Sequence, residues 1–247
     1  MIGHRGAAAV APENTLASFR AAAAMGAAMV EFDVMLTADQ QAVVFHDETL
    51  DRTTNGRGRV RDTPFAALSA LDAGGWFEPG FAGESVPSLR ETLELLQGLG
   101  MDANIEIKSG QEAEERTAET VLAIASEQWP NHRPPLLISS FSRRCLQIAR
   151  EIVPTWPRGL LVDRLPADWH EAARELGVST LHCQHRHLSP VAVSEILRAG
   201  YSVVAWTVDE PERARTLWNW GVDAVVTNNP GLLLTSDDIS AVCFPVW

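Results

Sequence analysis

Two short motifs near the amino terminus hold ionisable side chains at spacings that suit catalysis. Glu31 and Asp33 stand two positions apart in the run VEFDV, and His46-Asp47 follows closely. Side chains alternate between the faces of a strand, so Glu31 and Asp33 lie on the same face. Two ionised groups side by side need a cation or another partner to compensate them. The pair therefore indicates either a solvated strand end or a cation site.

Further ionisable residues follow other β-rich runs. His4-Arg5 ends the first run, and Glu106 and Lys108 alternate in NIEIK as Glu31 and Asp33 do. In a parallel barrel the reacting groups gather at the carboxyl ends of the strands. A single histidine is usually a structural or surface residue, and a lone EIK means little. Their joint position at strand ends favours one shared site, which a hairpin arm ending in His46 completes.

The residue types in this set suit phosphodiester cleavage. Glu31, Asp33 and Glu106 offer hard oxygen ligands for one divalent cation, Mg²⁺ or Ca²⁺. Arg5 can hold a phosphate as a fork and Lys108 as a point charge. The two histidines titrate near neutrality and suit a general acid and base. A metal ion would stabilise charge on the phosphoryl oxygens while the histidines move protons.

The elements that must position these residues alternate between β-rich and amphipathic runs, the pattern of βα units around a parallel sheet. Glycines at 177, 200 and 221 stand where helices end. The candidate strands are 1–4, 29–34, 42–46, 103–108, 135–140, 158–162, 179–183, 201–208 and 223–227. The candidate helices are 12–27, 88–99, 112–129, 143–152, 166–177, 190–200 and 210–221.

This pattern has one β segment too many for an eight-stranded barrel, and the run at 42–46 explains the surplus. Between residues 34 and 42 there is no room for the crossover that parallel neighbours need. A hairpin with its turn near Asp39-Gln40 fits, and it would set His46 opposite Asp33 at the same height. The remaining strands predict a TIM (β/α)₈ barrel in a single domain, residues 1–247.

The segment 48–86 interrupts the βα rhythm with an irregular run that is long for an ordinary connection. We interpret it as a small cap inserted after the hairpin that extends the second strand, with Trp76, Phe77 and Phe81 as its apolar content. A surface excursion is the alternative, and the position next to His46 favours a lid.

Composition limits the classes of function. The 247 residues include 46% hydrophobic and 21% charged residues, and the formal net charge is −12. This composition suits a globular protein and argues against binding to nucleic acid, which needs a basic face. The phosphate of a small-molecule substrate needs only a few placed cations. The oligomeric state stays open.

Two features of the sequence bear on the cellular compartment of the protein: its cysteines and its apolar run at 21–30. Cys145, Cys183 and Cys243 are far apart and match no disulfide framework or zinc pattern. The apolar run at 21–30 is too short to cross a bilayer and leads directly into Glu31. We expect a cytoplasmic protein without membrane insertion.

Two further features have competing interpretations. His182, Cys183, His185 and His187 form either a second metal site or an ordinary loop after the sixth barrel strand, and their spacing matches no reliable zinc pattern. Trp206 either offers an aromatic wall to a substrate or fills the mouth of the barrel.

With these residues described, the chain resembles the glycerophosphodiester phosphodiesterase family, most of all its cytosolic bacterial members. The resemblance covers essentially the whole chain and is carried by an ordered set of motifs: HRG, APENT, EFDV, TADQQAVVFHDETLDRTTNG, GWF, VPSL, IEIK, SSF, AWTV and GVDAVVTNNP. The ordered HRG, E-x-D, HD and E-x-K set is specific.

The resemblance implies a TIM barrel with a small insertion, and hydrolysis of glycerophosphocholine, glycerophosphoethanolamine and similar diesters to glycerol 3-phosphate and an alcohol. It implies three groups of site residues. These are the acid-base pair His4 and His46, the metal ligands Glu31, Asp33 and Glu106, and the phosphate contacts Arg5 and Lys108, with Trp206 facing the glycerol moiety.

The chain departs from the family pattern in few places. The first strand is cut to MIG before His4, Asn228 stands where relatives often carry Asp, and Asp209 stands where many carry Asn. Neither of the last two falls in the set that the resemblance assigns to catalysis.

Two other functions fit parts of the pattern. One is a barrel lyase or phospholipase that acts on a lipid phosphodiester, which the acidic charge and the lack of an amphipathic membrane-facing run disfavour. The other is a non-catalytic barrel that binds phosphodiesters. Binding alone needs the cations but not a pair of histidines for proton transfer.

Overall fold

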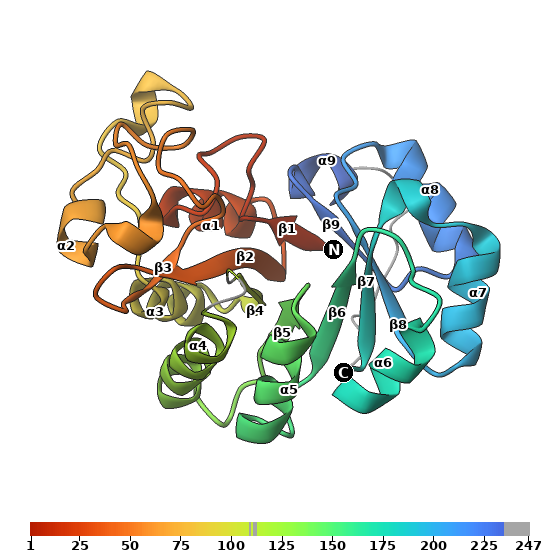
Figure 1. The fold of residues 1–247 in the computed structure, drawn as a ribbon. Helices are drawn as coiled ribbons and strands as arrows, with labels where there is room; N and C mark the ends of the chain where they lie inside the picture. Colours follow the sequence, from red (N-terminus) through yellow and green to blue (C-terminus); the bar gives the residue numbers. More distant parts are fainter. Residues whose placement is uncertain (109, 111–112, 235–247) are drawn as a thin grey trace.

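A closed barrel of parallel strands forms the centre of the protein (Figure 1). The computed structural model describes residues 1–108, 110 and 113–234. Neighbouring strands follow the order β1-β9-β8-β7-β6-β5-β4-β2-β3, and pairing of β1 with β2 closes the barrel. The expected TIM barrel is confirmed. The strands are β1 (Ile2–His4), β2 (Met29–Leu36), β3 (Ala42–Val44), β4 (Asp102–Ile107), β5 (Leu137–Ser140), β6 (Arg158–Val162), β7 (Thr180–Gln184), β8 (Ser202–Trp206) and β9 (Ala224–Thr227).

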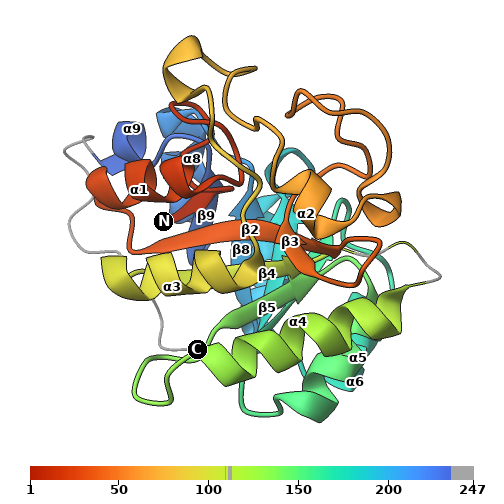
Figure 2. The same cartoon turned by 90° about the vertical axis from the view of Figure 1, so that its left-hand side faces the viewer.

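Helices surround the barrel and connect its strands (Figure 2). Ser88 and Glu91 form a capping box at the start of α3, and Gly100 ends that helix with a φ of 70°. The first residue of the predicted helix 112–129 lies outside the described residues. The helices are α1 (Leu16–Ala24), α3 (Leu89–Leu99), α4 (Glu114–Gln128), α5 (Arg143–Ile152), α6 (Trp169–Leu176), α7 (Pro190–Arg198), α8 (Pro211–Trp220) and α9 (Pro230–Leu234).

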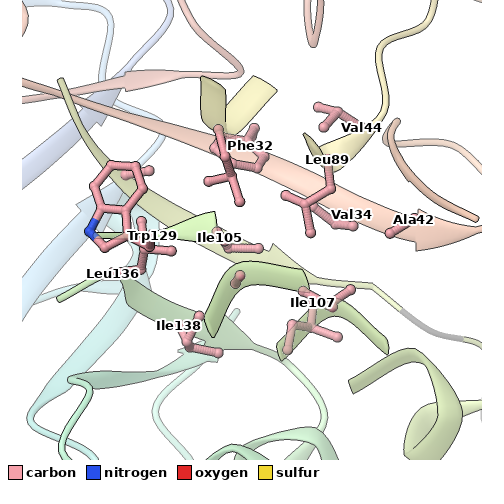
Figure 3. Close-up of a cluster of buried hydrophobic side chains, with 14 of the residues drawn as sticks. Phe32, Val34, Ala42, Val44, Leu89, Ile105, Ile107, Trp129, Leu136 and Ile138 are labelled. Carbon is pink, nitrogen blue, oxygen red and sulfur yellow. The ribbon is translucent and has the colours of Figure 1, made fainter. Parts of the chain in front are cut away.

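Apolar side chains fill both the space under the helices and the floor of the barrel. Phe32, Ile105 and Ile138 come from neighbouring strands and pack in one large cluster (Figure 3). Inside the barrel, a smaller cluster includes Ile2 and Val204, and Trp206 packs against it. Such filling makes the barrel a packed core rather than a pore. Polar side chains at the carboxyl ends of the strands therefore rest on a rigid apolar floor.

The predicted hairpin exists, but its register differs from the prediction. β3 runs antiparallel to β2 with Val34 opposite Val44, and the Phe45 N–H donates to the Asp33 carbonyl at 3.0 Å. Asp33 is thus opposite Phe45, and the expectation that it faces His46 was wrong by one residue. The cause is Gln40, whose φ of 62° completes a loop with an added left-handed residue.

The segment 48–86 packs beside β3 and builds its own small core. It contains the 3₁₀ helices η1 (Val60–Asp62) and η2 (Pro79–Phe81) and the short helix α2 (Phe65–Leu68). Its apolar content differs from the prediction, because Trp76 is 40% exposed, meets Phe77 edge-on and donates its Nε1–H to the Ala73 carbonyl at 2.8 Å. Small and aliphatic side chains occupy the interior instead, since compact side chains fit between a β-hairpin and irregular backbone. They are Leu50, Val60, Leu68, Ala73 and Val86, packed with Val43 and Phe45.

Other expectations concern cysteines and membranes. Cys145 and Cys183 are both buried, and Cys243 lies outside the described residues. Within the described ranges, no helix combines the length and the apolar character that a bilayer crossing requires.

Candidate active site

Three carboxylates meet at the carboxyl ends of β2 and β4. Asp33 on β2 is in register with Glu106 on β4, and Glu31 precedes Asp33 on the same face. One oxygen from each carboxylate lies within 4.8 Å of the others. Glu31 and Asp33 are only 5% and 1% exposed, so the barrel withdraws them from water. The predicted trio is therefore one compact set of carboxylate oxygens that could hold a metal ion.

Burial and mutual repulsion perturb these carboxylates. Burial, with the charges of Asp33 and Glu106, raises the pKa of Glu31 well above its usual range. Burial and then Asp33 raise the pKa of Glu106 to about 8. Burial also acts to raise the pKa of Asp33, but the charges of Arg5 and Lys108 outweigh it and lower that pKa. For Glu31 and Glu106, burial and the neighbouring carboxylates thus outweigh the nearby positive charges, an environment that a hard divalent cation fits well.

Arg5 and Lys108 both approach Asp33. The Arg5 Nε lies 3.2 Å from Asp33 Oδ2, and the Lys108 Nζ lies 3.6 Å from Asp33 Oδ1. Arg5 adopts a φ of 50°, and its backbone N–H donates to Glu31 Oε2 at 3.1 Å. Its buried Nε has no hydrogen-bond partner. A non-glycine residue at a positive φ that carries a buried, ion-paired side chain is typical of functional sites.

Each histidine has its Nδ1 occupied by a neighbouring side chain. His4 Nδ1 lies 2.7 Å from Asn228 Oδ1, and His46 Nδ1 lies 2.6 Å from Asp47 Oδ1. Burial lowers the pKa of His4 to about 4 and also lowers the pKa of His46. The Nε2 of His4 lies 4.0 Å from Glu31 Oε2. Both rings therefore keep Nε2 for other contacts.

A chain of ion pairs links His46 to Arg5 through the segment 48–86. Arg52 Nε donates to Asp47 Oδ2 at 2.6 Å, and its two terminal nitrogens each donate to Glu13 at 2.8 Å. Glu13 in turn accepts from Arg5 at 2.6 Å. Hydrogen bonds from Arg52 are the main cause that lowers the pKa of Asp47. The chain joins the loop after β1 to the segment that follows the β2–β3 hairpin, and β1 and β2 are paired neighbours in the barrel.

The site residues surround one cavity of about 120 Å³. Its lining includes every predicted site residue except Asp33, which contacts two of them. Asn104 Oδ1 and Ser139 Oγ are buried there without hydrogen-bond partners. A wider groove of about 930 Å³ shares His46 and Lys108 with the cavity and extends along the hairpin and the segment 48–86.

Trp206 meets both interpretations offered for it. It lines the cavity and also packs on the apolar floor. Its Nε1 donates to the His182 carbonyl at 3.0 Å, and its ring meets Phe141 edge-on with ring centroids 5.7 Å apart. These contacts hold the indole ring in place at the barrel mouth.

The histidines on β7 and directly after it do not converge. His182 is buried against Thr180 Oγ1 at 2.8 Å, while His185 accepts from Arg213 at 3.2 Å. His187 lies 3.7 Å from the exposed Asp163. In the part of the chain that the structure describes, the side chains grouped closely enough for a metal are the three carboxylates, not these residues. His182 and Cys183 lie on β7, and His185 and His187 belong to the 3₁₀ helix η3 (His185–His187), so the expected ordinary loop is not what the structure shows here.

Similarity to known proteins extends over nearly the whole chain. The model of the glycerophosphoryl diester phosphodiesterase family matches residues 4–232. The chain belongs to this family. The expectation of an enzyme, a glycerophosphodiester phosphodiesterase, is thereby confirmed.

Individual relatives match over nearly their whole length. A glycerophosphodiester phosphodiesterase of Caldanaerobacter subterraneus subsp. tengcongensis is 37% identical, over 95% of this chain and 96% of that protein. A solved phosphodiesterase of Oleispira antarctica, in complex with the product sn-glycerol-3-phosphate, is 38% identical with a TM-score of 0.94 and covers 96% of each chain. A glycerophosphodiester phosphodiesterase from Agrobacterium tumefaciens is 30% identical with a TM-score of 0.78, over 95% of this chain and 98% of that one.

Sequence reasoning missed several residues of this family member's site. Asn228 was set aside as a departure outside the catalytic set, but it contacts His4 directly. Glu13 and Arg52 were not singled out, although both stand in quoted motifs. Asn104 stands two positions before Glu106, a spacing that could have placed it on the inward face of the same strand.

Proposed function

We propose that the enzyme hydrolyses glycerophosphodiesters such as glycerophosphocholine and glycerophosphoethanolamine to glycerol 3-phosphate and an alcohol, with one divalent cation and two histidines. The observation that carries this proposal is the convergence of three carboxylates (Glu31 and Asp33 buried, Glu106 half-buried), the side chains of Arg5 and Lys108, and two histidines at one small cavity. The complex of the Oleispira relative with sn-glycerol-3-phosphate supports the same product class.

Glu31, Asp33 and Glu106 would hold the cation, Mg²⁺ or Ca²⁺. They supply only carboxylate oxygens, and burial together with the neighbouring carboxylates raises the pKa values of Glu31 and Glu106, which a bound cation would offset. When bound, the ion supplies positive charge next to the phosphoryl oxygens. Side chains of the protein itself would bind the phosphate and transfer the protons.

Arg5 and Lys108 would bind the phosphate. Arg5 brings a buried Nε without a hydrogen bond, and Lys108 lies on the other side of Asp33 at the edge of the cavity. Both side chains line the same cavity as Glu31 and Glu106, so a phosphoryl group in that cavity would meet both positive charges. Their charges also stabilise the additional negative charge of the transition state.

His4 and His46 would move the protons. One Nε2 accepts the proton of the nucleophilic hydroxyl as its oxygen bonds to phosphorus, and the other donates a proton to the alcohol oxygen as its bond to phosphorus breaks. The nucleophile is either water or the neighbouring glycerol hydroxyl. The second route forms a cyclic phosphate first, which water then opens.

The cavity and the wider groove suit the glycerol moiety and the departing alcohol of the substrate, respectively. The cavity of about 120 Å³ would take the glycerol moiety, because Asn104 and Ser139 have unused polar atoms there and Trp206 forms a wall. The wider groove beyond His46 would take the departing alcohol. The segment 48–86 then acts as a cap, which Arg52 joins to Glu13 and Asp47.

Release of glycerol 3-phosphate from glycerophosphocholine tests the proposal. We would measure it in Mg²⁺, in Ca²⁺ and in excess EDTA, for the wild type, His46→Ala and the matched control His132→Ala, an exposed histidine far along the chain. We expect turnover that EDTA and His46→Ala abolish and His132→Ala leaves intact. Turnover that survives both changes would refute the roles of His46 and the carboxylates. A transient cyclic phosphate in ³¹P NMR would identify the nucleophile as the glycerol hydroxyl.

A further inference from the structure

The hydrogen bond between His4 and Asn228 arises because β1 pairs with β9 where the barrel closes, and not from neighbouring sequence. β1 pairs with β9 in parallel, with Gly3 opposite Thr227, so the residue after each of them lies at the same rim position. These residues are His4 and Asn228, whose Nδ1 and Oδ1 atoms are 2.7 Å apart. Asn228 thus contacts the ring of a proposed catalytic histidine from the far end of the chain.

Asp209 determines which way the Asn228 amide points. Asn228 Nδ2 donates to Asp209 Oδ2 at 2.7 Å, and the Asn228 backbone N–H donates to Asp209 Oδ1 at 2.8 Å. The Thr227 hydroxyl donates to the same Oδ1 at 3.1 Å. An ionised carboxylate can only accept hydrogen bonds. The amide nitrogen must therefore face Asp209, and the amide oxygen must face His4.

The orientation of the amide in turn decides the tautomer of His4. An amide oxygen can only accept, so the neutral ring must carry its hydrogen on Nδ1. Nε2 is then left with a lone pair, on the side of the ring that lies 4.0 Å from Glu31 and lines the cavity. The opposite tautomer would set Nδ1 without a hydrogen against the amide oxygen, where no hydrogen bond forms.

We propose that Asp209 and Asn228 are positioning residues for the reaction: Asp209 orients the Asn228 amide, and Asn228 holds His4 in the tautomer that presents the Nε2 lone pair to the substrate. The kinetic consequence rests on the proposed function, but the tautomer itself does not. His46 has a carboxylate, Asp47, in the equivalent place. The two histidines are therefore held by different chemical groups.

Exchanging the two side chains tests this chain of contacts. In Asp209→Asn, an amide nitrogen replaces the Oδ2 that accepts from Asn228, so the Asn228 amide should rotate and offer its own nitrogen to His4. The hydrogen of the ring then moves to Nε2. In Asn228→Asp, two carboxylates face each other. The double variant Asp209→Asn/Asn228→Asp restores one donor and one acceptor, and it again offers an acceptor to His4 Nδ1.

Steady-state hydrolysis of glycerophosphocholine is the first readout. We expect kcat to fall about 100-fold or more in Asp209→Asn and less in Asn228→Asp, which keeps an acceptor at His4 Nδ1, with KM changed less than about three-fold, because proton transfer rather than binding is impaired. The double variant should recover to within about five-fold of the wild type. Asp163→Asn, which removes an exposed carboxylate at the other side of the rim, serves as the matched control. Losses that simply add in the double variant would overturn the proposal.

Nitrogen-15 NMR of the histidine rings is the second readout, with His4 assigned by its loss in His4→Gln. We expect the hydrogen on Nδ1 in the wild type and the double variant, and on Nε2 in Asp209→Asn. A wild-type ring with its hydrogen on Nε2 would overturn the proposal, even if the wild type shows no turnover. Circular dichroism checks that each variant folds. If Asp209→Asn does not fold, Asn228→Ala replaces it, and an unchanged Nδ1–H preference there would equally overturn the proposal.

Discussion

Replacing Glu106 by Gln should change how the stability of the metal-free enzyme depends on pH. Burial and the nearby Asp33 raise the pKa of Glu106 in the folded protein to about 8, against an ordinary value of 4.5. Between these two values the folded protein keeps the proton on Glu106 while the unfolded chain releases it. The free energy of unfolding therefore falls as the pH rises through this window.

The size of the effect follows from the same shift. Each pH unit inside the window costs about 1.4 kcal/mol when one state is protonated and the other is ionised. From pH 5 to pH 7 the wild type should lose about 2–3 kcal/mol through Glu106. For a chain of this size that corresponds to a fall in Tm of about 5–10 °C. Glu106→Gln has no charge in either state and lacks this loss.

Urea denaturation of the EDTA-treated protein at several pH values measures the difference. The quantity to compare is the free energy of unfolding of Glu106→Gln minus that of the wild type, which should grow by about 2–3 kcal/mol from pH 5 to pH 7. Glu119→Gln, which changes an exposed glutamate on α4, is the matched control and should show no such growth. A difference for Glu106→Gln that stays constant over this range would refute the electrostatic reasoning.

Further predictions concern the metal, the segment 48–86 and the glycerol subsite. Returning Mg²⁺ or Ca²⁺ to EDTA-treated protein at about 100 times its Kd should stabilise the fold by about 2.7 kcal/mol in thermal melts, and Glu31→Gln should reduce this gain. Arg52→Gln should speed limited proteolysis within the segment 48–86 and lower kcat, whereas Arg57→Gln, whose side chain is 89% exposed, should do neither. Because the Arg52 side chain is 45% exposed, its effect on the free energy of unfolding should stay below about 1 kcal/mol. Trp206→Ala should weaken inhibition by glycerol 3-phosphate about ten-fold, measured as the inhibition constant; an unchanged constant would mean that the indole only fills the barrel mouth.

The sequence by itself was enough to predict the barrel and to group most of the residues that meet at its candidate site. Alternating β-rich and amphipathic runs predict parallel βα units, and the short gap before residue 42 allows only a hairpin. Parallel strands share one catalytic rim, so spacing within each strand indicates which side chains meet. Glu31, Asp33 and Glu106 were grouped correctly because strand periodicity is a local property.

The tertiary structure decided the features that depend on more than one strand. The left-handed Gln40 moved the hairpin register by one residue, a detail that residue types hardly specify. The core of the segment 48–86 formed from Leu50 and Leu68 rather than Trp76, because irregular backbone leaves no periodicity to interpret. The contact of Asn228 with His4 arises from the pairing of the first strand with the last. Contacts that close a barrel join residues far apart in sequence, and no local pattern encodes them.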